Sequence, residues 1–282
     1  MRKIIPILIF SLVNLLALQF ISAEEIKLGA TLPLSGNYAT YGNLIKDGIE
    51  LAVDELNSSE MPIKVFYEDV PLPGKVIATA INKLLNQDKI HALAGNFWNP
   101  AIPVMSPYIE RKGIPAFHTA IADDLVLGAS DFIFSTNGKI KDEAKLLAEY
   151  AYETKGARKA CILYILTTFG ENYAQYFEKY FKQLGGEVIL NDSIHLTDVD
   201  YRAALTKVKS KKPDLLMAGF FGTNIGTLLK QARELNFEKP ILGTYETEDP
   251  SAIKVAKKHA DGVLYYSPEP KEKDSFQKAF NS

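Results

Sequence analysis

The sequence has 282 residues, of which 47% are hydrophobic and 23% are charged, and its formal net charge is −2. These proportions are typical of soluble globular chains, and they exclude a disordered, collagen-like or coiled-coil protein. Lysine and arginine are scattered along the chain and the isoelectric point is about 6.1, which argues against a nucleic-acid groove and against a polybasic membrane patch. The length is sufficient for one large or two medium domains.

The first segment of the chain departs from this average composition. Residues 1–3 carry two positive charges, residues 4–21 are almost wholly apolar, and Ser22 and Ala23 are small. This pattern predicts a cleavable signal peptide over residues 1–23, and therefore an exported protein. A transmembrane anchor is the alternative, because an apolar run of this length just spans a bilayer. Polar and helix-breaking residues interrupt the run and acidic residues follow it, which favours the signal peptide.

Cys161 is the only cysteine, so an exported form of this chain has no internal disulfide and depends on its own hydrophobic core. It lies within residues 160–166, an apolar run of strand length. A nucleophilic cysteine needs an exposed, electropositive setting with a base beside it. We therefore expect Cys161 to be a small buried hydrophobic residue.

After the first segment, strand-like apolar runs alternate with stretches in which apolar residues recur at helical spacing. In the first half, strands are expected over residues 26–32, 63–67, 90–94 and 114–117, and helices over residues 41–56 and 75–85. The strands are mostly apolar rather than alternating. This is typical of a parallel sheet that is covered by helices on both faces.

The second half repeats the pattern. Helices are expected over residues 142–152, 172–184, 201–208 and 224–235, and strands over residues 160–166, 187–190 and 214–218. The sequence therefore predicts an α/β fold of two doubly wound lobes with parallel central sheets. The first lobe is expected over residues 24–137 with 269–282, and the second over residues 138–268. Direct crossovers near residues 135–138 and 266–270 join them, and residues 271–282 are expected to begin a helix.

Polar or aromatic loops follow three predicted strands at their carboxyl ends, where open α/β sheets bind ligands. These loops are residues 32–42, 95–100 and 118–120. A loop that leads into a helix also presents free backbone N–H groups and the positive end of the helix dipole, which suits an acceptor-rich ligand. We expect the three loops to form one wall of a ligand cleft.

The local motifs of common enzymes are absent. The sequence contains no Gly-x-Ser-x-Gly, no Gly-x-Gly-x-x-Gly, no Gly-x-x-x-x-Gly-Lys-Ser/Thr and no Cys-x-x-Cys. His91, His195 and His259 share no metal-ligand spacing, and His118 stands alone in a predicted loop. We therefore expect a binding protein with no enzymatic activity, no cofactor and no metal.

Residues 26–57 contain Pro-Leu-Ser-Gly-x-x-Ala-x-x-Gly followed by Gly-Ile-Glu-Leu-Ala-Val. This stretch resembles the start of branched-chain amino-acid-type solute-binding proteins of bacterial ABC importers. Further segments agree in the same order: Thr-Phe-Gly at residues 168–170, residues 200–214, Leu-Lys-Gln-Ala-Arg-Glu-Leu at residues 229–235, and Gly-Val-Leu at residues 262–264. Each motif alone is weak, but their combined order is specific and covers nearly all of the chain after residue 23.

The resemblance implies a type I periplasmic binding fold, in which two lobes hinged by three crossovers close on a ligand. It implies a monomeric periplasmic protein that captures a small organic solute and delivers it to an ABC-transporter permease. In that family the chain runs on by several tens of residues, so the fold looks truncated at its C-terminus. A sensor or cell-envelope regulator with the same fold is the alternative function.

The resemblance also implies site residues. In the amino-acid binders a hydroxyl after the third strand holds the ligand carboxylate, and that position is Asn99 here. Backbone N–H and a further hydroxyl come from the loop after the fourth strand, where these positions are Ala120 and Ala122 here and Thr119 precedes them. The aromatic walls correspond to Tyr41 of the first lobe and to Phe169 and Phe221 of the second, with Trp98 beside them. The carboxylate that would hold the ligand ammonium falls on Tyr245, and Glu246 is its neighbour.

These departures bear on the identity of the solute. A charge-assisted hydrogen bond is worth about 1.5 to 3 kcal/mol, so loss of the ammonium partner weakens an amino acid by roughly 10 to 150-fold. An aromatic pocket with little charge favours a planar or apolar solute, such as an aromatic acid or an amide. If Glu246 points into the cleft instead, an amino acid fits. Phe169 and Phe221 have a second interpretation, as core residues.

Overall fold

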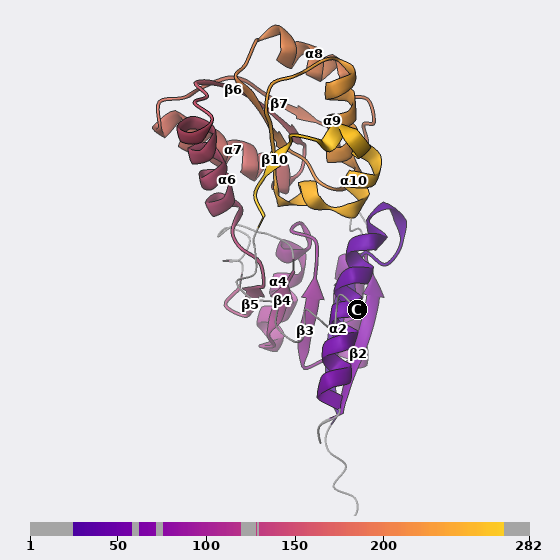
Figure 1. Ribbon diagram of the computed structural model, residues 1–282. Helices are drawn as coiled ribbons and strands as arrows, with labels where there is room; N and C mark the ends of the chain where they lie inside the picture. Colours follow the sequence, from indigo (N-terminus) through magenta and orange to yellow (C-terminus); the bar gives the residue numbers. More distant parts are fainter. Residues whose placement is uncertain (1–24, 58–61, 72–75, 120–127, 129, 268–282) are drawn as a thin grey trace, which may run out of the picture.

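The computed structural model describes residues 25–57, 62–71, 76–119, 128 and 130–267. These residues form two lobes, each built around a five-stranded sheet in which every described strand pair is parallel (Figure 1). The predicted α/β fold of two parallel sheets is confirmed. The signal peptide expected over residues 1–23 and the helix expected over residues 271–282 lie outside the described residues.

The first sheet has the strand order β2-β1-β3-β4-β5. Its strands are Ile26–Leu32 (β1), Ile63–Asp69 (β2), Ala92–Asn96 (β3), Ala116–His118 (β4) and Ile133–Ser135 (β5). The carboxyl-terminal half of β1 is fully buried, because β2 and β3 pair with its two edges. Because all pairs are parallel, the five carboxyl ends meet at one edge of the sheet, and residues 97–100, which follow β3, line a cavity together with residues of the second lobe.

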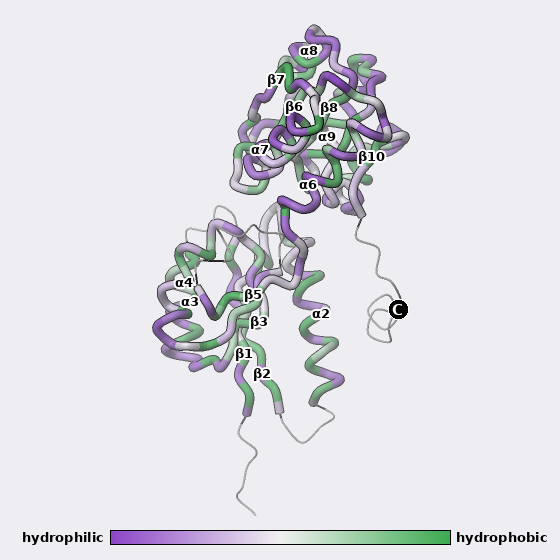
Figure 2. Tube along the Cα trace, turned by 90° about the vertical axis from the view of Figure 1, so that its left-hand side faces the viewer, coloured by the Kyte–Doolittle hydropathy of each residue, from purple (hydrophilic) through white to green (hydrophobic). Residues whose placement is uncertain are grey.

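Helices cover both faces of the first sheet, as the apolar strands predict. Figure 2 shows α2 (Ala39–Asn57) on one side of the sheet, and α3 (Ile77–Lys83) and α4 (Ala101–Lys112) on the other. A π-helical segment, Leu84–Asp88, continues α3. Side chains of α3 and α4 pack with Leu93 of β3 in one hydrophobic core. Helix α4 could not be predicted from the sequence, because Pro103 and Pro107 interrupt its helical pattern.

The second sheet has the strand order β10-β9-β8-β6-β7. Its strands are Lys159–Ile165 (β6), Glu187–Ile194 (β7), Leu215–Gly219 (β8), Ile241–Gly243 (β9) and Leu264–Tyr265 (β10). Strands β6, β7 and β8 were predicted from the sequence. Strands β5, β9 and β10 were not, because they have only two or three residues each and so show no periodicity.

The second sheet separates two hydrophobic cores. One core lies under α6 (Ile140–Glu149) and α7 (Thr168–Gln183), and the other lies under α8 (Arg202–Ser210), α9 (Gly222–Glu234) and α10 (Pro250–Ala256). Cys161 on β6 is buried in the second of these cores, where loss of water raises the pKa of its thiol to about 11. Its expected role as a small buried hydrophobic residue is confirmed.

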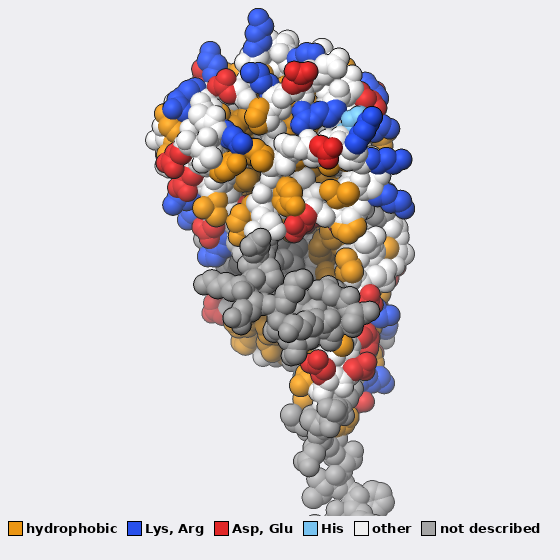
Figure 3. Space-filling model, viewed as in Figure 1, with side chains coloured by type: hydrophobic (Ala, Val, Ile, Leu, Met, Phe, Trp, Pro, Cys, Tyr) orange, Lys and Arg blue, Asp and Glu red, His pale blue; other side chains and the backbone are white. Residues whose placement is uncertain are grey.

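The chain passes from β5 of the first sheet to α6 of the second lobe through residues 136–139, where a crossover was expected. The expected crossover near residues 266–270 lies only partly in the described chain. No helix of the described residues has both the length and the apolar character that a membrane-spanning helix needs. Lys and Arg side chains are interspersed with Asp and Glu over the outer surface of the second lobe (Figure 3).

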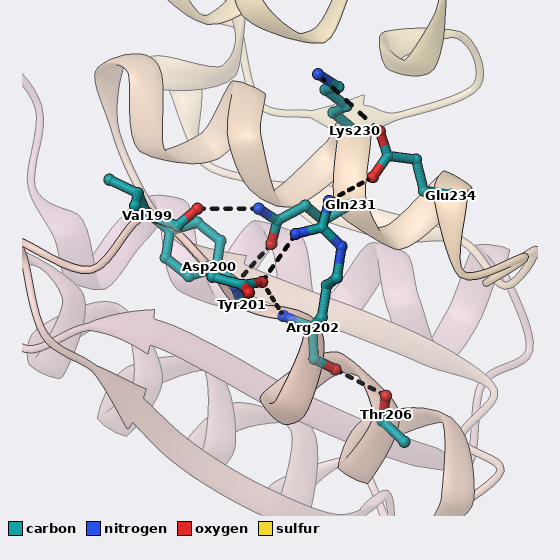
Figure 4. Close-up of polar contacts among 8 residues, drawn as sticks. All are labelled: Val199, Asp200, Tyr201, Arg202, Thr206, Lys230, Gln231 and Glu234. Atoms are coloured by element: carbon teal, nitrogen blue, oxygen red, sulfur yellow. Dashed lines mark hydrogen bonds and ion pairs between the residues drawn. The ribbon is translucent and has the colours of Figure 1, made fainter.

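Helix α9 fixes the loop between β7 and α8, one of the loops that face the first lobe. The side chain of Gln231 donates to the carbonyl of Val199 at 2.9 Å and accepts from the backbone N–H of Tyr201 at 2.6 Å (Figure 4). Nearby, Asn224 donates from its amide to the carbonyl of Leu196 at 3.2 Å. These amide hydrogen bonds tie the backbone of the loop to α9.

Candidate ligand-binding site

A cavity of about 100 Å³ lies between the two lobes. The first lobe supplies residues 97–100, which follow β3, and the second lobe supplies residues that follow β6, β7, β8 and β9. Open α/β sheets bind ligands at this edge, so the cavity has the expected position for a ligand site. Its lining residues are Phe97, Trp98, Asn99, Pro100, Thr167, Thr168, Phe169, Leu196, Phe221, Tyr245 and Glu246.

The walls of the cavity are mainly aromatic. Phe97 and Trp98 of the first lobe meet edge to face, with ring centroids 4.5 Å apart. Phe169 and Phe221 of the second lobe meet in the same way at 5.4 Å. The ring of Tyr38, 5.8 Å from that of Phe221, connects the two groups across the cleft. A solute in this cavity therefore contacts rings of both lobes.

Trp98 is held by its own lobe. Its indole N–H donates to the carbonyl of Val70 at 3.0 Å, and the edge of its ring meets Tyr38 at 5.3 Å. Phe169 and Phe221 line the cavity but also pack against the two cores of the second lobe. The two interpretations of these phenylalanines are therefore compatible, because each side chain packs against a core and also borders the cavity.

Asn99 belongs to a buried polar chain. The Asn96 amide lies 2.9 Å from Nδ1 of His118, and Nε2 of His118 lies 2.6 Å from Oδ1 of Asn99. An amide nitrogen donates, so Nδ1 accepts and Nε2 carries the proton that His118 donates to Asn99. Burial lowers the pKa of His118 to about 4, which keeps the ring neutral. His118 orients Asn99, a role that the sequence analysis did not assign.

Thr119 borders a second cavity of about 490 Å³, which shares Phe97, Tyr245 and Glu246 with the first. The hydroxyl of Thr119 donates to the carbonyl of Asn96 at 3.2 Å. Two further expected site residues, Ala120 and Ala122, lie outside the described residues.

Glu246 is a buried carboxyl group that borders both cavities of the cleft. It is 7% exposed. The phenol of Tyr41, on α2 of the first lobe, donates to Oε2 of Glu246 at 2.7 Å, and the hydroxyl of Tyr245 forms a further hydrogen bond with it. Burial raises the pKa of Glu246 above its ordinary value. The structure thus brings together Tyr41, Tyr245 and Glu246, which the sequence placed in one site from positions far apart in the chain.

Glu143 is a further buried carboxyl group at the site, and the sequence analysis missed it. Its Oε2 accepts from the phenol of Tyr173 at 2.5 Å, and its Oε1 accepts from the backbone N–H of Tyr245 at 2.9 Å. Burial raises the pKa of Glu143 to about 7, and the nearby charge of Glu246 adds to the shift. An acidic residue in the first turn of a helix normally indicates only a favourable contact with the helix dipole, so the sequence gave no signal of this role.

Residues 25–282 match the family described as periplasmic binding protein. The chain belongs to this family. Over 239 residues this chain is 28% identical to a Leu/Ile/Val-binding protein of Rhizobium johnstonii. The match covers 83% of this chain and 65% of that relative. A leucine-specific-binding protein of Salmonella typhimurium is 23% identical to this chain over 285 residues. That match covers 99% of this chain and 77% of the relative. The chain thus spans about two thirds to three quarters of the length of these curated relatives.

Solved structures support the fold of this periplasmic binding protein. A solute-binding protein of an ABC transporter from R. palustris, in complex with 4-hydroxybenzoate, has a TM-score of 0.84 at 20% identity, with 92% of this chain and 73% of that chain covered. A branched-chain amino acid transporter substrate-binding protein of Streptococcus pneumoniae, in complex with isoleucine, has a TM-score of 0.80 at 24% identity, with 91% and 75% covered.

Among the described residues, no group of three His, Cys, Asp or Glu side chains is close enough together to hold a metal ion. The polar groups at the cavity are amide, hydroxyl and carboxyl groups, and the rest of the lining is apolar. This composition, a mostly apolar concavity with a few converging polar groups, is typical of small-molecule binding sites.

Proposed function

We propose that this chain is the solute-binding component of an ABC importer. It captures a small organic solute between its lobes and delivers it to a permease of the inner membrane. The observation that carries the proposal is the aromatic cavity, which residues of both lobes line. A solute that contacts both lobes stabilises the closed arrangement over the open one, and the permease recognises the closed arrangement.

The names of relatives support a transport function. The curated relatives are Leu/Ile/Val-binding and leucine-specific-binding proteins, and the solved neighbours hold isoleucine, 4-hydroxybenzoate or benzoate. An amino acid, an amide and an aromatic acid are therefore the first solutes to examine. The cavity favours a solute with an apolar body, because its surface is mostly aromatic.

The proposal includes export and the absence of chemical change in the solute. The mature chain begins at Glu24, after removal of residues 1–23, and acts as a monomer in the periplasm. N-terminal sequencing of the secreted protein is expected to begin at Glu24. An uncleaved chain that pellets with membranes would contradict this part of the proposal.

The proposed site has two sides. From the first lobe, Tyr41, Trp98, Asn99 and Thr119, together with the loop that contains Ala120 and Ala122, hold the solute. From the second lobe, Phe169, Phe221, Tyr245 and Glu246 close over it. Support comes from the cavity linings, which contain all of these residues that the structure describes.

The test is a thermal-shift screen of amino acids, amides and aromatic acids, followed by calorimetry on variants. Phe221→Ala is expected to cost about 2 to 4 kcal/mol of binding free energy, because a wall of the cavity is lost. Tyr180→Ala is the control, since Tyr180 is partly buried against the core of the same lobe and lies outside both cavity linings. Equal losses of affinity in the two variants would contradict the assignment of the site.

A further inference from the structure

Glu143 lies outside both cavity linings of the cleft, yet it contacts a residue that borders them. It belongs to the first turn of α6, directly after the crossover of residues 136–139, and it is 2% exposed. Its Oε2 accepts from the phenol of Tyr173 on α7, and its Oε1 accepts from the backbone N–H of Tyr245. Glu143 therefore joins the crossover to the segment Tyr245–Glu248, which carries side chains into the cleft.

The backbone contact holds the first residue of this segment. Tyr245–Glu248 is a 3-10 helix, and the first N–H groups of a helix have no partner within the helix. Glu143 supplies a partner for the N–H of Tyr245 from a distant part of the chain. Because Glu246 is the next residue, the position of its side chain in the cleft depends on this contact.

Titratable and charged groups approach Glu143 from several elements. They are Tyr173 on α7, Tyr245 and Glu246 in the segment before α10, Lys139 and Asp142 nearby on the chain, and Tyr266 after β10. None of the ion pairs between described residues includes Glu143. Its charged form therefore meets a second buried carboxyl group, Glu246, without a cation paired to it in the described part of the chain.

This arrangement favours the neutral form of Glu143. Burial raises its pKa to about 7, and the charge of Glu246 adds to the shift. The two hydrogen bonds act in the other direction, because an ionised carboxyl group accepts them more strongly. Burial is the larger effect, since the pKa is raised and not lowered. The described conformation therefore retains the proton at a pH where a carboxyl group in water has lost it.

A cavity of about 230 Å³ adjoins Glu143, and its lining includes crossover residues 137–139 and Tyr245. Its volume is sufficient for several water molecules. An ionised Glu143 gains hydration if the segment Tyr245–Glu248 moves and water enters from this side, and the same movement separates the two carboxyl groups. Loss of the proton thus favours a conformation in which the segment has left its position in the cleft.

We propose that Glu143 is a positioning residue of the ligand site. In its neutral form it holds the segment Tyr245–Glu248 where the solute needs it, and in its ionised form the segment loosens and the cleft binds its solute less tightly. This inference rests on the proposed function, that the cleft holds a small organic solute, and it adds a residue outside the cleft that controls the affinity.

The sign of the pH dependence follows from the raised pKa. The tight conformation binds the proton of Glu143 more strongly than the loosened one, so it is favoured in mild acid and lost as the pH rises through about 7. One unit of difference in pKa between the two conformations corresponds to about a tenfold change in their ratio.

Hydrogen exchange of the solute-free protein tests the movement directly. After correction for the intrinsic effect of pH on exchange, a peptide that contains residues 245–248 is expected to lose protection about tenfold between pH 6 and pH 8. Glu143→Gln keeps an oxygen acceptor and cannot ionise, so its protection is expected to stay constant. No loss in the wild type, or an equal loss in Glu143→Gln, overturns the inference.

Two further variants identify the titrating group. Tyr173→Phe removes a hydrogen bond that favours the ionised form of Glu143, so the midpoint of the loss is expected to move to higher pH. Asp142→Asn, at the exposed neighbouring position of the same helical turn, is the matched control and is expected to keep the wild-type profile. An unchanged or lower midpoint in Tyr173→Phe, or a flat profile in Asp142→Asn, overturns the inference.

Calorimetry with leucine and with benzoate measures the effect on affinity, because neither probe changes its charge between pH 6 and pH 8. The affinity of Glu143→Gln divided by that of the wild type is expected to rise about tenfold over this range for a probe that binds. The ratio removes the pH effects that both proteins share. A ratio that stays constant overturns the inference.

The outcomes separate this inference from the function on which it rests. If a probe binds and the ratio is constant, the cleft still holds a small solute and only the role of Glu143 is excluded. If neither probe binds while hydrogen exchange shows the expected profile, the proposed function is contradicted for these two solutes, and control of the segment by Glu143 is supported.

Discussion

Two buried side chains near the cleft, His118 and Glu143, have shifted pKa values for the same reason, which is the loss of surrounding water. For both, burial favours the neutral form. His118 is a base, so its pKa falls to about 4, and Glu143 is an acid, so its pKa rises to about 7. Their effects on stability therefore run in opposite directions with pH.

His118 makes the fold sensitive to acid. Its pKa is about 6.5 when unfolded and about 4 when folded, so the unfolded chain binds the proton first. The stabilisation is fully present above pH 6.5 and is lost as the pH falls toward 4. At about 1.4 kcal/mol per pKa unit, lowering the pH from 7.5 to 5 is expected to cost about 2 kcal/mol.

Urea unfolding at the two pH values tests this prediction in the wild type and in His118→Gln. The variant has no titrating group at this position, so only the wild type loses this stabilisation in acid. The difference in unfolding free energy between wild type and variant is therefore expected to be about 2 kcal/mol smaller at pH 5 than at pH 7.5. A difference that does not change with pH would mean that His118 titrates normally.

Glu143 is expected to have the opposite effect. Its pKa rises from 4.5 to about 7 on folding, so the folded chain retains the proton more strongly than the unfolded chain. Stability on this account falls as the pH rises from 4.5 through 7. Relative to the wild type, Glu143→Gln is expected to gain about 2 kcal/mol of unfolding free energy between pH 5 and pH 8. Parallel stability curves for the two proteins would refute the shifted pKa.

At the scale of elements, the contact between α9 and α10 holds the segment that carries Glu246. Gly226 of α9 lies against the backbone of α10, and a Cβ there would be 2.4 Å from the carbonyl oxygen of Ala252. The residues Tyr245–Glu248 form a short 3-10 helix directly before α10. The position of the carboxylate in the cleft therefore depends on close packing of these two helices.

Gly226→Ala is expected to destabilise the protein by about 1 to 3 kcal/mol, because the added methyl group forces α10 away from α9. This is opposite to the usual effect, since Gly→Ala in a helix interior normally stabilises by about 1 kcal/mol. The exposed Lys230 on the same helix gives the control, and Lys230→Ala is expected to stay within about 0.5 kcal/mol of the wild type. Thermal unfolding of both variants measures the effect. A stabilised Gly226→Ala would show that the helices are not in close contact.

The long elements could be predicted from the sequence because each one carries its own signal. The apolar runs of β1, β6 and β8, and the helical spacing in α2 and α9, need no knowledge of the rest of the chain. Short strands such as β9 exist only because neighbouring strands pair with them. For α4 the local signal pointed the wrong way, since proline within a helix normally ends it.

The candidate site, too, could be predicted from the sequence only in part. Loop position and resemblance led to the aromatic residues and to Glu246, which the structure brings to the cavity linings. Neither the contact of Glu143 with Tyr245, 102 residues away, nor the hydrogen bond from His118 to Asn99 has a sequence signature. Such groups become visible only when tertiary contacts bury them, because an isolated Glu or His in a sequence is most often exposed.

At the scale of the whole molecule, two of the contacts between described residues that join the lobes across the cleft come from neighbouring tyrosines. The ring of Tyr38 meets Phe221, and the phenol of Tyr41 donates to Glu246. The first contact is apolar and the second is polar. Both Tyr38 and Tyr41 lie at the beginning of α2 or in the turn before it, so both contacts come from one end of one helix.

Removing both contacts is expected to shift the molecule toward an open arrangement. In the double variant Tyr38→Ala, Tyr41→Phe, a buried hydrogen bond worth about 1 kcal/mol and an aromatic contact of similar size are lost. Small-angle scattering is expected to show a radius of gyration larger by on the order of 1 Å, against roughly 19 Å for a compact chain of this length. Because solute binding must then offset the cost of closure, affinity for every solute is expected to fall by the same factor, about 10 to 30-fold.

The control is Tyr108→Phe, on α4, where the ring packs on the core of the first lobe. If the double variant keeps the wild-type radius and the wild-type affinity, these contacts do not determine how the lobes close.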